Sequence, residues 1–235
     1  MVQDREPDAG SARAAADAAD LAAWRHGDAR AGEELCERHY AAVARFFHNK
    51  VSGAAQDDLV HETFLACLEG AASFRGHACF RTFLFGIAHR VLAGYVRRMA
   101  RSSARRADCD ELEELPASVC SIGPLAPLVA DRQQRALLEA LRRLPLVQQI
   151  ALELHYWEDL TAGQIGEITG VPLGTAKSRL RDGRHALQAE LAALASSPEP
   201  LHTTLDNLER WAGRVRAASG QPPARARVSS VVRPG

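Results

Sequence analysis

Apolar residues recur at helical spacing along two stretches of the chain, residues 21–101 and 131–195. Spacing of three to five positions places such residues on one face of a helix. In the first stretch they fall into three groups: Leu35, Tyr40, Val43, Phe46 and Phe47; Leu59, Phe64, Leu65 and Leu68; and Phe83, Leu84, Ile87, Val91 and Tyr95. Alternation with period two is rare, and β-branched residues are sparse. The pattern predicts an all-α fold of two small helical domains.

Three other segments lack a pattern that would build a core. Residues 1–20 are rich in Ala, Asp and Arg without apolar periodicity, which predicts a mobile N-terminal tail. Residues 102–130 contain several prolines and glycines, which indicate a flexible linker between the domains. Residues 196–235 form a C-terminal extension, in which Leu and Trp at helical spacing predict one helix over 202–218.

Charge changes this picture only locally. The 235 residues carry 29 basic and 29 acidic side chains, which excludes a uniformly basic nucleic-acid coat protein. Charges are nevertheless separated: residues 90–106 hold six arginines and no acid, and residues 108–114 hold five acids and no base. The acidic block fits a solvated linker, and it also fits a segment that shields the arginines or mimics a phosphate chain.

Composition also bears on location. No run approaches eighteen apolar residues, so we expect no membrane span. The acidic start of the chain is unlike a secretory signal, and five widely spaced cysteines favour reduced thiols. We therefore expect a cytoplasmic protein.

The strongest local signal is a helix-turn-helix in the second domain. Thr161 followed by Gln164 forms a capping box, which marks a helix start. Gly170 can adopt a positive φ at the corner, and the small Gly166 allows a second helix to cross closely. That second helix is expected over residues 173–187.

The second helix has a basic outward face. With Ala176 placed inward and a step of about 100° per residue, Leu180 and Leu187 also point inward. Between residues 171 and 187, four bases and one acid give a local charge of +3. Such a helix suits the major groove of DNA, although a solvated helix in a bundle would look similar. The outward or flanking residues are Lys177, Ser178, Arg181, Asp182 and His185.

Both domains resemble the bacterial extracytoplasmic-function (ECF) sigma factors over about 60% of the chain. The resemblance of the second domain rests on Leu141, Arg142, Arg143, Leu144, Pro145, Gln149, Tyr156, Trp157, Glu158, Asp159, Leu160, Gly174, Thr175, Ala176, Lys177, Ser178, Arg179 and Leu180. That of the first rests on Gly27, Asp28, Leu35, Tyr40, Asp58, Leu59, Val60, Glu62, Phe64, Phe74, Arg75, Gly76, Phe80, Arg81, Thr82, Leu84, Ile87, Ala88 and Arg97. It implies a subunit that gives core RNA polymerase its promoter specificity and promotes strand opening.

The resemblance also implies three sets of site residues. The polymerase-binding set is Asp57, Asp58, Leu59, Glu62 and Phe64. The set for the start-proximal promoter element, where a flipped base of the non-template strand would be held, is Phe74, Arg75, Gly76, Phe80, Arg90, Arg97 and Arg98. Phe83, Phe85 and Ile87 are expected in the core instead. The set for the upstream element is Thr175, Lys177, Ser178, Arg179, Arg181, Asp182 and Arg184.

The implied partners are core RNA polymerase, promoter DNA and a cognate anti-sigma factor, with a monomer when free. Phosphate-binding glycine loops, HExxH and GxSxG are absent from the sequence, so we expect no catalytic residues and no cofactor. Cys36 and His39 lie one helical turn apart, but without a compact four-ligand set we expect no metal. The alternative functions are a helix-turn-helix regulator that is not a polymerase subunit, and a sigma-like interaction module.

Overall fold

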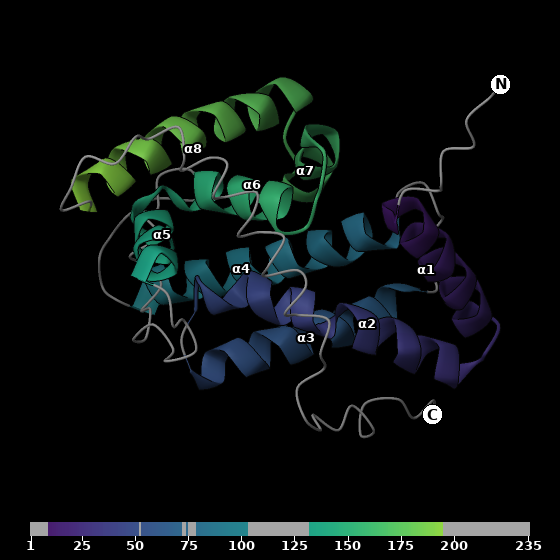
Figure 1. Ribbon diagram of the computed structural model, residues 1–235. Coiled ribbons are helices and arrows are strands. Elements are labelled where there is room, and N and C mark those ends of the chain that lie inside the picture. The colour runs from purple at the N-terminus through teal and green to yellow at the C-terminus, as the bar shows by residue number, and fades with distance from the viewer. Residues whose placement is uncertain (1–8, 52, 72–73, 75–78, 103–131, 195–235) are drawn as a thin grey trace, which may run out of the picture.

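The computed structural model describes residues 9–51, 53–71, 74, 79–102 and 132–194. The described residues form helices and no strand, which confirms the all-α class (Figure 1). The first half of the structure consists of α1 (Ala9–Arg25), α2 (Ala29–His48), α3 (Ala54–Ala71) and α4 (Phe80–Ser102). The second half consists of α5 (Arg132–Arg143), α6 (Leu146–Tyr156), α7 (Ala162–Thr169) and α8 (Leu173–Leu194).

Helix α1 corrects one expectation. Residues 9–20 were predicted to lie in a mobile tail, but they form most of α1, which packs against α2 and α4. Asp17 is buried there and accepts hydrogen bonds from His39 Nε2 at 2.8 Å and Arg38 Nη1 at 2.7 Å. Before Leu21, the contact of α1 with its neighbours is made by the polar pairs of Asp17 and Asp20, so a search for apolar periodicity does not find it.

Helix α4 is the central element of the molecule. Figure 1 shows it between α2 and α3 on one side and α6–α8 on the other. Leu84, Phe85, Ala88 and Leu92 are fully buried, and further buried residues extend around more than half of the helix circumference. A helix buried over so wide an arc must be covered by several neighbours. Its contacts with α1, α2, α3 and α7 supply that cover.

Helix α8 organises the second half. It contacts α5, α6 and α7, and it continues to Leu194, seven residues beyond the predicted end at Leu187. The predicted linker, apart from Ser102, and the C-terminal extension with its helix over 202–218 lie outside the described residues. Among the described helices, none has the length and apolar character needed to cross a membrane.

The two halves pack against each other. The contact joins α4 to α7, and the core residues of both halves form one continuous cluster. This arrangement places the helix-turn-helix of the second half above α4, as Figure 1 shows.

Candidate nucleic-acid interface

The corner between α7 and α8 has the local geometry that its sequence predicts. The Gln164 N–H donates to Thr161 Oγ1 at 3.3 Å, and the Thr161 N–H donates to Gln164 Oε1 at 2.9 Å, which completes the capping box. Gly170 ends α7 in the left-handed region with φ 71°, and its N–H donates to the Gly166 carbonyl. A glycine adopts this conformation without the clash that a Cβ would cause.

Gly166 lets the turn approach α7 closely. A Cβ at this position would lie 2.8 Å from the Val171 carbonyl oxygen and 3.8 Å from Ala176 Cβ. The Val171 N–H also donates to the Gly166 carbonyl at 2.9 Å, so the turn is tied to the glycine that it touches. The prediction that a small residue permits the crossing is confirmed.

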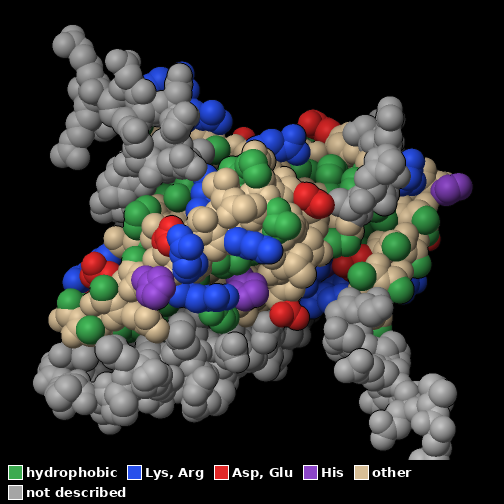
Figure 2. All heavy atoms as spheres, turned by 90° about the horizontal axis from the view of Figure 1, so that it is seen from above, with side chains coloured by type: hydrophobic (Ala, Val, Ile, Leu, Met, Phe, Trp, Pro, Cys, Tyr) green, Lys and Arg blue, Asp and Glu red, His purple; other side chains and the backbone are tan. Residues whose placement is uncertain are grey.

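The basic face of α8 points away from the core. Ala176, Leu180 and Leu187 are buried, as the helical projection requires. Lys, Arg and His side chains gather on the face of the molecule seen from above (Figure 2). Of the candidate residues for the upstream element, the exposed ones are Lys177, Arg181 and Asp182, and the partly buried ones are Thr175, Ser178, Arg179 and Arg184.

Two arginines of α8 are oriented by neighbouring side chains. Arg181 Nε lies 3.0 Å from Asp182 Oδ1 on the exposed face. Arg184 Nε donates to the Tyr156 hydroxyl at 2.9 Å, and its guanidinium lies 5.6 Å from that ring centroid. The second half therefore positions Arg184 from within, whereas Arg181 extends toward solvent.

The candidate residues for the start-proximal element, which lie before α4 and along its length, divide into exposed and buried members. Arg90, Arg97 and Arg98 are exposed, and Phe74 is partly exposed with its ring 4.7 Å from that of Phe83. Arg75 and Gly76 lie outside the described residues.

Phe80 is a buried residue, which argues against the DNA contact expected of it. It is 3% exposed, and its ring packs 5.3 Å from the His39 ring of α2. Phe85 and Ile87 are buried as expected, whereas Phe83 is partly buried against the core. Phe74 is thus the aromatic side chain of this set that is accessible for stacking.

The polymerase-binding candidates divide in the same way. Asp57, Asp58 and Glu62 are exposed on α3. Leu59 and Phe64 are buried, so they hold α3 in place and do not form part of its outer surface.

Leu65 was missed as a candidate for the surface of α3. Helical spacing from Leu59 and Phe64 predicts that it is buried, but its exposed fraction is 51%. Its place directly after the buried Phe64 is a signal that could have identified it, because adjacent residues of a helix point in different directions. An apolar side chain beside exposed carboxylates is typical of a protein-binding surface.

Burial shifts the pKa of titratable groups at the contact between the halves and in the core. Burial and the nearby cations Arg179, Lys50, Arg90 and Arg97 lower the pKa of His89 to about 4. Burial raises the pKa of Cys36 to about 11, which opposes the thiolate that a metal would need. The described part of the chain contains no group of three or more residues arranged to bind a metal.

Comparisons with known proteins agree with this architecture. The family described as "Sigma-70 region 2" matches residues 35–103, and the family described as "Sigma-70, region 4" matches residues 134–187. The ECF RNA polymerase sigma-E factor of Haemophilus influenzae is 26% identical over 176 residues, which cover 72% of this chain and 91% of the relative. The sigma-E factor of Escherichia coli K12 is 25% identical over 172 residues, with 72% and 90% coverage. The chain belongs to the ECF sigma factors.

Solved structures support the fold of this sigma factor. CnrH, in complex with the cytosolic domain of CnrY, matches with a TM-score of 0.53 and 23% identity, covering 77% of this chain and 99% of that one. RpoE from Bartonella quintana, in complex with the anti-sigma factor NepR, matches with a TM-score of 0.52 and 20% identity, covering 68% and 96%.

Proposed function

We propose that this sigma factor reads the upstream promoter element through the outward face of α8. The observation that carries the proposal is the exposure of Lys177 and Arg181 on a helix whose inner face is fixed by the corner at Gly166 and Gly170. Arginine and lysine pair with guanine edges or with phosphates in the major groove. Thr175, Ser178, Arg179, Asp182 and Arg184 complete this surface.

The first half supplies the other two surfaces in this proposal. The α3 acids Asp57, Asp58 and Glu62, with Leu65, bind core polymerase, since charge speeds docking and apolar contact adds affinity. Arg90, Arg97 and Arg98 of α4, together with Arg75 and Gly76, bind the start-proximal element. Phe74 offers a ring on which an unstacked base can be held, and capturing such a base favours the melted duplex without ATP.

The remaining expectations concern the partners, the cellular location and the domain bounds of the chain. Because CnrH and RpoE were solved with CnrY and the anti-sigma factor NepR, we include a cognate anti-sigma factor as a partner of this chain. We also propose that the free chain is a monomer in the cytoplasm and that it acts as a non-catalytic subunit. Its domains would span residues 131–195 and, because α1 packs on α2 and α4, residues 9–101 instead of 21–101.

Transcription with purified core polymerase tests the proposal. The parent chain should direct initiation at specific promoters, and Arg181→Ala should reduce base preference by about 1–3 kcal/mol per lost contact. Arg30→Ala is the matched control, because this exposed arginine pairs with Glu34 on α2, away from α8. Sequence-specific DNA binding without initiation would support the regulator instead. Unchanged base preference in the Arg181 variant would contradict its role as a reader.

A further inference from the structure

Leu173, the first residue of α8, is a large apolar residue that is exposed to solvent. Its exposed fraction is 50%, and among the described residues only Leu65 of α3 is a large apolar residue of comparable exposure. Leu65 lies beside the exposed acids of α3, on the surface proposed to bind core polymerase. Because single exposed leucines are common on protein surfaces, the surroundings of Leu173 decide whether it belongs to a binding surface.

The backbone at Leu173 is fixed against α7. The Val171 N–H donates to the Gly166 carbonyl at 2.9 Å, and the Ala176 N–H donates to the Pro172 carbonyl at 3.1 Å. The Leu173 nitrogen would lie 3.8 Å from a Cβ placed at Gly166, so α7 and the start of α8 are in close contact here. The backbone of Leu173 is therefore held at the corner, while its side chain stands outside the apolar core.

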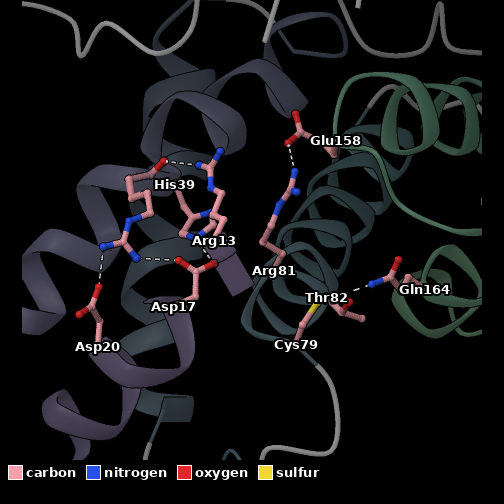
Figure 3. A network of polar contacts seen from close by, with 10 residues as sticks. Arg13, Asp17, Asp20, His39, Cys79, Arg81, Thr82, Glu158 and Gln164 are labelled. Atoms are coloured by element: carbon pink, nitrogen blue, oxygen red, sulfur yellow. Dashed lines mark hydrogen bonds and ion pairs between the residues drawn. The ribbon is translucent and has the colours of Figure 1, made fainter. Parts of the chain in front are cut away.

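Helix α7, which supports this corner, is itself fixed at its start. The Gln164 side chain accepts the Thr161 N–H at 2.9 Å. Its Nε2 points toward Cys79 Sγ at 3.7 Å, as Figure 3 shows. A side chain on a pre-ordered backbone loses little conformational entropy when a partner covers it, so a contact made by Leu173 adds to affinity.

Leu173 continues the basic face of α8 toward the corner. Residues four positions apart lie on the same side of a helix, which aligns Leu173 with Lys177 and then with Arg181. Both basic residues are exposed. Gly174 is exposed as well, and a Cβ there would meet no atom within 4 Å, so the backbone beside Leu173 is open to close approach. The face thus begins with an apolar contact and continues with two cations.

Duplex DNA offers a partner with this order of chemistry. The N-terminal residues of a recognition helix contact base edges in the major groove. Among those edges the C5-methyl group of thymine is the apolar substituent, whereas guanine and the phosphates pair with arginine and lysine. A rise of about 1.5 Å per residue places Leu173 and Arg181 about 12 Å apart along α8, which corresponds to roughly three to four base pairs.

We propose that Leu173 is a specificity-determining residue that contacts the C5-methyl group of a thymine in the upstream promoter element. This inference deepens the proposed function and rests on it, because it requires α8 to lie in the major groove. Cytosine, adenine and guanine present no methyl group there, so leucine favours thymine over all three. The thymine should lie roughly three to four base pairs from the base that Arg181 contacts.

The test removes single methyl groups from the DNA. Holoenzyme assembled from the full-length chain and core polymerase is first used to select its preferred upstream element from randomised duplexes. Each thymine of that element is then replaced in turn by deoxyuridine, which lacks only the methyl group. One replacement should weaken binding by the parent about fourfold, the effect of losing one buried methyl group. Leu173→Ala should weaken binding to the unmodified duplex by at least about that factor and should not respond to that replacement.

Two further variants separate this contact from a general loss of affinity. Lys177→Ala is the matched control, because Lys177 lies one turn further along the same exposed face; it should weaken binding and keep the response to deoxyuridine. Leu173→Met keeps an apolar side chain and should also keep the response. Because Leu173 is exposed, both of its variants should retain the helix content and the urea midpoint of the parent.

The outcomes distinguish this inference from the proposed function. If the holoenzyme selects an element but no thymine in it responds to deoxyuridine, or if the response survives Leu173→Ala, Leu173 does not contact a methyl group and the proposed function stands. Loss of the response in Lys177→Ala would equally overturn the inference, since the response would then follow overall affinity. If no sequence is selected from the pool, the proposed function fails and the inference fails with it.

Discussion

Two glycines on α7 should respond in opposite ways to alanine. At Gly166 a Cβ would lie 2.8 Å from the Val171 carbonyl oxygen, a backbone atom held by the Val171–Gly166 hydrogen bond. At Gly163 the nearest atom to a Cβ would be Thr161 Oγ1 at 3.8 Å, an ordinary contact. Both substitutions gain helix propensity, worth up to about 1 kcal/mol each.

The difference between the two variants isolates the cost of the close approach. Overpacking at a rigid contact costs about 1–3 kcal/mol, so Gly166→Ala should be less stable than Gly163→Ala by that amount. Urea unfolding followed by circular dichroism gives both free energies of unfolding from the midpoint and the slope. Gly166→Ala should also weaken binding to promoter duplex, because the corner sets the angle of α8. Equal stability of the two variants, within about 0.5 kcal/mol, would refute this account of the corner.

Three further predictions concern pH, the α3 surface and the aromatic residues. The pKa of His89 is lowered to about 4, so acid must protonate this imidazole more readily in the unfolded chain than in the folded one. The free energy of unfolding should therefore fall by up to about 3 kcal/mol as the pH drops from about 6.5 to 4. In acid titrations, His89→Gln should flatten that dependence. Leu65→Ser should weaken binding to core polymerase in an affinity assay while changing stability by less than about 0.5 kcal/mol, and an unaltered affinity would exclude Leu65 from the docking surface. Phe80→Ala should lower the free energy of unfolding, measured in urea, by about 3–5 kcal/mol. Phe74→Ala should mainly impair strand opening, measured by permanganate footprinting. The reverse outcome would return Phe80 to the DNA-contact set.

The sequence predicts well those structural features that depend on interactions between residues close together in the chain. The capping box at Thr161, the left-handed Gly170 and the inward positions of α8 each depend on residues a few positions apart. Helical periodicity likewise identifies α2 and α4, because their apolar faces are wide and regular. The exposed Lys177 and Arg181 follow directly from the same projection.

The features that the sequence does not reveal depend on distant partners. Helix α1 is placed by Asp17, whose partners Arg38 and His39 lie on the next helix, 21 and 22 positions further along the chain. Lys50 and Glu153 would each be expected at the surface, and each is buried only because the other is there. Local periodicity carries no information about such pairs, so the contact between the halves emerges only in three dimensions.

Helix α1 has a practical consequence for dissecting the chain. The region-2 match begins at residue 35, which makes that position an inviting N-terminal boundary for a truncated fragment. A cut there would delete Asp17 and Trp24 and strip the cover from His39, whose imidazole is fully shielded in the intact chain. It would also remove Gly32, over which the Trp24 indole lies so closely that a Cβ would fall 2.7 Å from the ring. Expression of the first half alone should therefore begin upstream of Ala9, and a shorter version is expected to be poorly soluble.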